Sequence, residues 1–398
     1  MVDVTTIFLL AVAAGASFFA AWTIGAGSTG STPFAPAVGA NAITTLRATF
    51  IVGLLGLAGA VLQGGAITRT IGDELVTDVT LSPLAAAVAL TIAAFYIAAG
   101  VFKGYPIATA FAITGSVVGV GIAMGGGPAW DRYFEIGLYW LLTPVFVAPA
   151  SYVCTKLLRG EALAEKSVLA ALAGVTGLTI VNMEFLLLGA AGEESSLAAV
   201  IGVLIPGPWW VGVALVSIGA AGVSAWVMWR AVVRDTVVAQ RRFLLGLGGL
   251  VAFTAGGGKV GLAVGPLLPL VQGVWGDVPI GWILAFGGIG ILLGSWMLAP
   301  RMIKALSQDY SELGPRRSIG VLIPSFVIAQ IGIFFGIPMS FNEIFICAII
   351  GTGYAVGSET VSREKLFYTV VAWVGSIVFS FFVGYGVYAG ISMLTGTV

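Results

Sequence analysis

The chain has 398 residues, of which 59% are hydrophobic and only 9% are charged. A soluble domain carries about a quarter charged residues, so this composition excludes a chain that covers a water-facing surface of its own size and predicts lipid as the main solvent. Eighteen basic residues balance 18 acidic ones and no histidine is present, which argues against nucleic acid as a partner and removes the commonest metal ligand.

The apolar runs predict an all-α polytopic membrane protein. They are continuous over about 20 residues, as in membrane-spanning helices, and do not alternate over about 10 residues as in a β-barrel. The run from Val4 to Trp22 has no basic flank and no cleavage site, so we expect a first helix and not a signal peptide. We predict about 10–12 transmembrane helices, placed at 4–24, 46–66, 82–102, 106–126, 134–156, 167–190, 209–230, 243–256, 280–299, 319–335, 339–356 and 366–394.

Two stretches that are rich in glycine and proline interrupt these runs, at 25–45 and 257–279. Because transporters break helices at such residues inside the membrane, we expect broken or re-entrant segments here. The two stretches also resemble each other, with closely spaced glycines followed by a proline turn in the segments 25–36 and 256–266. This similarity indicates an internal repeat.

A second pair of similar segments supports the repeat. Tyr105–Thr109 and Ile337–Phe341 both have proline in second position, and Gly-x-Gly follows each at the same distance. The equivalent loops 67–80 and 300–317 have opposite charge bias, as two inverted repeats would produce. We therefore expect a first inverted repeat, a set of linking transmembrane helices, and a second inverted repeat with a terminal helix, at 1–133, 134–239 and 240–398 respectively.

The charges of two short loops predict the orientation of the chain in a cell membrane. Loop 230–242 holds four arginines and one aspartate, whereas loop 191–208 holds two glutamates and no basic residue. By the positive-inside rule the first loop faces the cytoplasm and the second faces out. Counting helices from these loops places both the N-terminus and the C-terminus outside.

At its repeated positions the sequence resembles the inorganic phosphate transporter (PiT) family. Segments 22–39 and 252–266 are similar to the family's repeated Gly-Ala-Asn-Asp-type motif, and segments 105–111 and 337–343 are similar to its repeated Pro-Val-Ser-Thr-Thr-His-type motif. The similarity extends over nearly the whole chain. It implies a phosphate transporter that is built from two inverted repeats.

The chain departs from the family at the motif positions that carry charge. In the family the aspartates of the first motif are associated with sodium coordination and substrate binding, and both are absent here. The Asn-Asp positions hold Gly27-Ser28 and Gly258-Lys259, and the histidine positions hold Phe111 and Glu343.

An oxyanion inside a membrane needs N–H donors and a compensating positive charge. Helix N-termini supply both, glycines let the backbone approach the anion, and hydroxyl groups donate hydrogen bonds. The predicted substrate-binding residues are therefore Gly27, Ser28, Thr29, Ser31, Thr32, Gly257, Gly258, Lys259, Thr109 and Ser340. The alternatives are a flexible loop or helix packing for the glycine-rich stretches, snorkelling or an ion pair for the lysine, and bonds to the helix backbone for the hydroxyls.

Polar side chains within apolar runs are the candidates for binding a coupling ion, either sodium or a proton. These residues are Asn342, Glu343 and Glu184. We favour Glu343, because it lies beside Ser340 in a predicted membrane segment, although a salt bridge with Lys259 is an alternative role. Glu184 lies between the repeats, where an interface or structural role is equally consistent with its position.

These features predict a secondary active transporter of a tetrahedral oxyanion that works by alternating access. Inorganic phosphate is the first choice and sulfate, which has the same shape, is the second. A non-transporting anion sensor or subunit is the alternative from another class. An enzyme is not expected, because the sequence shows no nucleophile–base pair, paired catalytic carboxylates or metal-ligand cluster. No cofactor is expected beyond a coupling ion, and a homodimer is compatible with such a fold.

Overall fold

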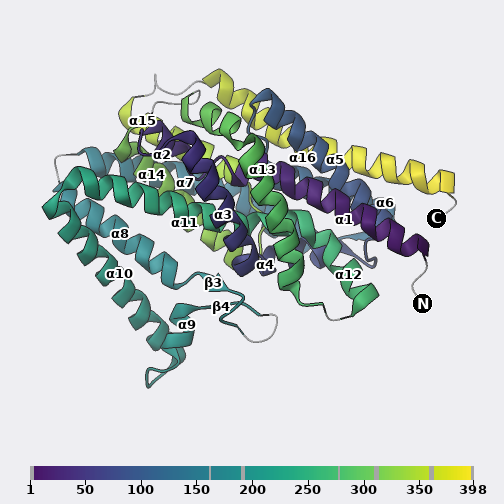
Figure 1. The fold of residues 1–398 in the computed structure, drawn as a ribbon, viewed down its shortest axis with the longest axis horizontal. Coiled ribbons are helices and arrows are strands. Elements are labelled where there is room, and N and C mark those ends of the chain that lie inside the picture. Colours follow the sequence, from purple (N-terminus) through teal and green to yellow (C-terminus); the bar gives the residue numbers. More distant parts are fainter. Residues whose placement is uncertain are drawn as a thin grey trace.

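The computed structural model describes residues 4–160, 163–189, 193–276, 278–308, 313–357 and 363–395, and helices dominate it (Figure 1). The α-helices are α1 (Val4–Ile24), α2 (Ala35–Gly39), α3 (Thr45–Gln63), α4 (Gly65–Arg69), α5 (Pro83–Lys103), α6 (Thr109–Ala123), α7 (Trp130–Arg159), α8 (Glu165–Val181), α9 (Leu197–Gly202), α10 (Trp209–Arg234), α11 (Thr236–Val264), α12 (Leu268–Trp275), α13 (Ile280–Gln308), α14 (Pro315–Phe334), α15 (Phe341–Val356) and α16 (Arg363–Thr395). Two π-helical turns, η1 (Gly25–Thr29) and η2 (Thr70–Glu74), and the 3-10 turn η3 (Gly265–Leu267) connect some of them. Four short strands pair antiparallel, β1 (Val76–Thr77) with β2 (Gly127–Pro128) and β3 (Glu184–Phe185) with β4 (Ser195–Ser196).

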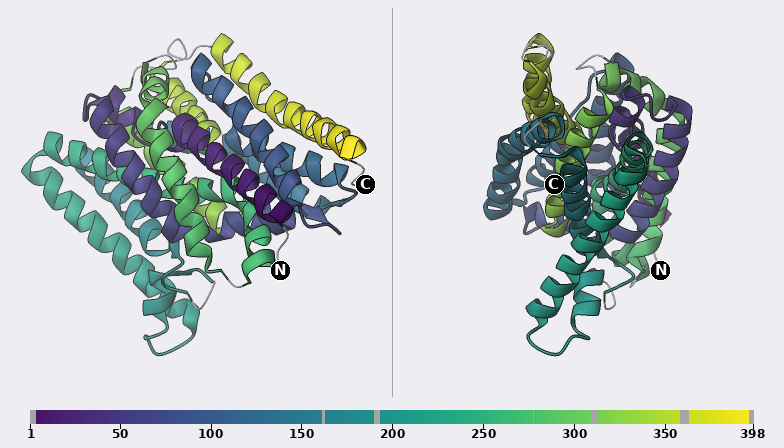
Figure 2. Two further views of the ribbon diagram at one scale, coloured as in Figure 1. Left: turned by 45° about the vertical axis from the view of Figure 1, so that its right-hand side comes forward. Right: turned by 90° about the vertical axis from the view of Figure 1, so that its left-hand side faces the viewer.

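Long helices lie side by side with roughly parallel axes (Figure 2, left). Among the described residues, nine helical segments are long and apolar enough to cross a membrane. The prediction of an all-α polytopic membrane protein is confirmed. α6 and α15 are apolar but have only 15 and 16 residues. At about 1.5 Å per residue they are shorter than the hydrocarbon layer of about 30 Å, so each must begin or end within the membrane.

The hairpins α5–α6 and α14–α15 are closed by the same turn. Gly104 and Gly336 adopt positive φ angles of 75° and 63°, a conformation that glycine reaches without steric cost. In both turns the glycine amide donates to the carbonyl three residues earlier, and the next amide donates to the carbonyl five residues earlier. A proline comes next in each, at Pro106 and Pro338. The two segments that the sequence predicted to be repeated therefore share one backbone structure.

The helices that surround these hairpins pack in reciprocal pairs. α6 packs against α16, and α15 packs against α7. In the same way α1 packs against α13, and α11 packs against α3. Such reciprocal pairs are expected when each of two repeats packs its helices against helices of the other. The inverted orientation and the boundaries at 133 and 239 remain predictions.

α8 and α10 form a hairpin at one edge of the bundle (Figure 1). Leu215, Ile218, Val223 and Trp226 of α10 are exposed, as expected for a face that contacts lipid. The beginning of α1 and the end of α16 lie at the same end of the molecule (Figure 1). This agrees with termini on one side of the membrane, whereas the assignment of that side as the outside remains a prediction.

Part of the prediction for the interrupted segments is wrong. Residues 256–259 do not break a helix, because α11 runs through them without interruption, and the helix changes only at η3. A Cβ atom on Gly256 would lie 2.8 Å from the Cα atom of Gly56, so this glycine allows α11 to pack closely on α3. α1 likewise continues into the π-helical η1 before the chain turns at 30–34. The span predicted at 167–190 also ends early, at Val181.

Candidate functional site

The side chain of Lys259 lies in the middle of the bundle and is completely buried. Its Nζ atom donates to the hydroxyl of Thr109 and to the backbone carbonyl of Met339, both at 2.6 Å. Thr109 is the first residue of α6, and Met339 lies just before α15. The ammonium group therefore joins the beginnings of the two short helices.

A buried lysine costs several kcal/mol in a membrane unless other groups compensate its charge. The carboxylate of Glu343 attracts the ammonium group of Lys259 through space, but no ion pair joins these two described residues. The ring of Phe341 lies 5.7 Å from Nζ, within the range of a cation–π contact. Of the three N–H groups of the ammonium, two are used, and no acceptor among the described residues takes the third. The charge of Lys259 is thus only partly compensated by the protein.

Asn342 of α15 bonds to η1 and to the segment before α6. Its Nδ2 atom donates to the carbonyl of Ile107 at 2.7 Å and to the carbonyl of Gly27 at 3.2 Å. Its Oδ1 atom is buried without a partner among the described residues, and so is the hydroxyl of Ser28, which follows Gly27. Unpaired buried polar atoms are rare and costly in native proteins. An acceptor and a hydroxyl therefore remain available for a polar guest.

The beginnings of α6 and α15 add positive potential to the same region. The first amides of a helix lack carbonyl partners within the helix and carry a partial positive charge. α6 has no capping side chain, whereas Ser340 caps α15 by accepting from the amide of Glu343 at 3.4 Å. Two helix N-termini and one ammonium group produce a positive potential, which suits a bound anion.

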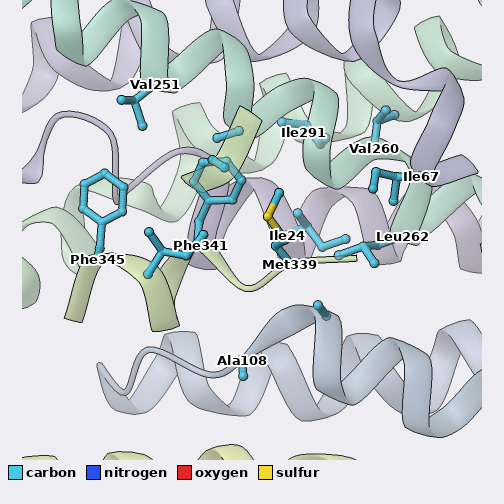
Figure 3. Close-up of a cluster of buried hydrophobic side chains, with 14 of the residues drawn as sticks. Ile24, Ile67, Ala108, Val251, Val260, Leu262, Ile291, Met339, Phe341 and Phe345 are labelled. Atoms are coloured by element: carbon cyan, nitrogen blue, oxygen red, sulfur yellow. The ribbon is translucent and has the colours of Figure 1, made fainter. Parts of the chain in front are cut away.

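Apolar side chains enclose these polar groups. Ile24 from α1, Val260 from α11, Met339 before α15 and Phe341 at the start of α15 belong to one cluster of buried side chains (Figure 3). Water is therefore kept away, and electrostatic interactions inside the site are stronger than they would be in bulk solvent. Because Lys259, Thr109 and Asn342 are all buried, a solute can reach them only after the surrounding helices move.

The chain is similar to known proteins over nearly its whole length. Residues 24–384 match the model of the phosphate transporter family. The chain belongs to the phosphate transporter family. A relative from Thermococcus kodakarensis, named "Putative phosphate permease", is 26% identical over 401 residues, which cover 89% of this chain and 91% of the relative. The chloroplastic inorganic phosphate transporter 2-1 of Arabidopsis thaliana is 24% identical over 90% of this chain and 68% of its own length.

A solved structure described as the sodium-dependent phosphate transporter has the same fold, with a TM-score of 0.81 and 24% identity. The similarity covers 97% of this chain and 99% of that one. The family is one of transporters, so the expectation that this chain is not an enzyme is confirmed.

Some hydroxyl residues proposed from the sequence are occupied by bonds within the protein. Thr32 and Ser31 donate to the carbonyl of Ser28 at 3.0 and 3.2 Å, and Thr29 donates to the carbonyl of Ala255 at 3.5 Å. Among the described hydroxyl residues at 28–32, Ser28 is the one whose side-chain oxygen has no hydrogen-bond partner. The binding role of all of these residues remains a prediction.

The glycines of α11 beside the site allow close helix packing and do not provide the expected free amide donors. A Cβ atom on Gly257 would lie 2.8 Å from the Cβ atom of Gln63, and one on Gly258 would lie 3.2 Å from Ile333. Because both glycines are inside a continuous helix, their amides belong to its hydrogen-bond ladder. The expectation of free amide donors at these two positions is therefore wrong, and the glycines permit close packing.

Glu184 lies away from Lys259, in strand β3, where it pairs with Ser196 of β4. It lines a separate cavity of about 470 Å³ with Glu194 and Arg69. Burial and the nearby carboxylate of Glu194 raise the pKa of Glu184 to about 7, and Arg69 partly opposes this shift. Glu194 accepts from the amide of Gly65 at 2.8 Å, and burial raises its pKa as well. These contacts suit a structural role for this pair at least as well as ion coupling, and a coupling role for Glu184 remains a prediction.

The sequence did not identify the groups that hold the turns before α6 and α15. The indole of Trp373 in α16 donates to the carbonyl of Pro106 at 3.1 Å, and the indole of Trp140 in α7 donates to the carbonyl of Pro338 at 2.7 Å. In both cases, a tryptophan from the helix packed against the short helix thus binds the proline of the turn before that short helix. The local signal was a proline two residues after each turn glycine, but the tryptophan that binds its carbonyl lies far away in the sequence.

Proposed function

We propose that this chain is a secondary active transporter of inorganic phosphate that works by alternating access. The observation that carries the proposal is the buried ammonium of Lys259, held between the beginnings of α6 and α15 with one N–H that no described residue accepts. The relatives named as phosphate transporters support phosphate as the substrate class. The location of the site between two similar hairpins is typical of transporters built from repeats.

The unpaired side-chain oxygens of Asn342 and Ser28 favour phosphate over sulfate. Phosphate is partly protonated at neutral pH and benefits from a hydrogen-bond acceptor, whereas sulfate carries no proton. The Oδ1 atom of Asn342 is a buried acceptor without a partner, and the hydroxyl of Ser28 can donate to an anionic oxygen. A site with an unpaired buried acceptor penalises a ligand that cannot donate to it.

Uptake into proteoliposomes tests the proposal. The purified chain is reconstituted, and initial rates are measured for radiolabelled phosphate and for radiolabelled sulfate at equal concentration and pH. We expect saturable phosphate uptake that exceeds sulfate uptake by about tenfold or more, since one unmet buried hydrogen bond costs about 1–3 kcal/mol. Equal rates would favour a general oxyanion permease. Phosphate entry no faster than in protein-free liposomes would end the proposal and leave the sensor or subunit alternative.

Glu343 is the carboxylate that we propose for proton coupling. It lies in the first turn of α15, where Lys259 from α11 and Tyr139 from α7 face it, together with Cys347 of its own helix. We expect the substitution Glu343→Gln to remove the dependence of the initial phosphate uptake rate on pH, because glutamine cannot bind and release a proton. The ratio of variant to wild-type rates, measured between about pH 5.5 and 8, is the readout, since titration of phosphate itself cancels in it. A constant ratio across this range would show that Glu343 is not the coupling group.

A further inference from the structure

The two oxygen atoms that bind the ammonium of Lys259 are of the kind that hold alkali cations in transporters. One is a side-chain hydroxyl, from Thr109, and the other is the backbone carbonyl of Met339, in the unwound segment before α15. Carbonyl groups of unwound segments coordinate sodium in transporters with broken helices, and hard cations generally prefer oxygen ligands. The two atoms lie 2.6 Å from Nζ, so the ammonium group fills the position between them.

We infer that Lys259 is a built-in cation that takes the place of a transported sodium ion, so that phosphate uptake by this chain does not need sodium. The inference rests on the proposed function. The protein of similar solved structure, in contrast, is described as sodium-dependent. The positive charge that an ion would bring from solution is here attached covalently to α11.

The charge balance of the site supports this role. Phosphate with a single negative charge and the ammonium of Lys259 together form a neutral pair when the nearby carboxyl group of Glu343, whose charge acts on Lys259, is protonated. A sodium ion placed beside a buried ammonium would be repelled by like charge in a medium of low dielectric constant. A lysine at this position therefore supplies the charge that favours anion binding and also opposes sodium binding.

Replacement of sodium tests the inference on the wild-type chain. Phosphate uptake into proteoliposomes is measured in sodium chloride and in N-methyl-D-glucamine chloride at the same pH and ionic strength. We expect initial rates that agree within about twofold in the two salts. Stimulation by sodium of about tenfold would overturn the inference while leaving the phosphate transporter itself established. Absence of phosphate uptake in both salts would instead refute the proposed function.

Two substitutions of Lys259 provide a readout that does not depend on transport. Lys259→Ser removes the ammonium and frees the two oxygen atoms, whereas Lys259→Met fills the same space with an unbranched apolar chain. We expect sodium, compared with choline, to raise the melting temperature of purified Lys259→Ser by about 3 °C or more and to leave Lys259→Met and the wild type unchanged. Equal stabilisation of all three proteins by sodium would show that the ion binds elsewhere and that the lysine does not replace it. If Lys259→Ser does not fold, the comparison of salts on the wild type decides the question.

Discussion

Substitution of Lys259 by methionine is expected to lower the initial rate of phosphate uptake by on the order of 100-fold or more. Removing one partner from a buried contact between a charge and its ligand costs about 2–5 kcal/mol, and each 1.4 kcal/mol corresponds to about a factor of ten. Methionine has nearly the length of lysine but no charge and no donor, so it removes the ammonium with little change in volume. The rate of radiolabelled phosphate entry, corrected for the amount of reconstituted protein, is the measurement.

The same variant should fold at least as well as the wild type. A lysine that is fully buried with no bonded carboxylate is expensive, and an apolar replacement of similar shape is often neutral or stabilising. The melting temperature of Lys259→Met should therefore be unchanged or higher, which separates loss of binding from loss of structure. Lys103→Met is the matched control, because Lys103 is exposed at the end of α5. A phosphate rate near that of the wild type in Lys259→Met would place the substrate elsewhere.

The positions of the helices could be predicted from the sequence because lipid imposes a simple rule. A continuous apolar run of sufficient length must form a helix there, and the ends of α1, α3 and α5 lie within a few residues of the predicted spans. The rule does not say what a glycine does inside such a run. Gly256 was interpreted as a break, but the close approach of Gly56 on α3 explains it as a contact between helices. That distinction depends on a partner 200 residues away.

In the candidate site, too, residues could be predicted where the neighbouring sequence marks them but not where only the fold selects them. Lys259, Thr109, Asn342 and Glu343 were proposed because polar side chains in apolar runs are conspicuous, and the structure places them together. The carbonyl of Met339 could not be proposed, since every residue has a carbonyl group and only the fold selects one. For the same reason the sequence predicted a free backbone amide at Gly258, whereas in the structure that amide belongs to the hydrogen bonds of the continuous helix α11.

Substitution of Gly256 by valine is expected to prevent stable folding of the chain. The new Cβ atom would lie 2.8 Å from the Cα atom of Gly56, and backbone cannot move aside as the end of a flexible side chain can. Overpacking in a core typically costs about 1–3 kcal/mol, and a clash with backbone at a contact between two long helices should exceed this range. The measurement is the monodisperse fraction on size-exclusion chromatography in mild detergent, together with the melting temperature of what remains.

Gly246→Val is the matched control for this substitution. Gly246 lies on the same helix α11, ten residues earlier, and a Cβ atom there would meet nothing within 4 Å. Both variants introduce the same β-branched side chain into a helix, so their intrinsic cost in helix propensity is similar. We expect Gly246→Val to remain monodisperse with a melting temperature within about 2 °C of the wild type, and Gly256→Val to be lost or lowered by about 10 °C or more. Equal behaviour of the two variants would mean that α11 does not pack on α3 through Gly256, and it would remove the support for placing Lys259, less than one turn further along, at the centre of the bundle.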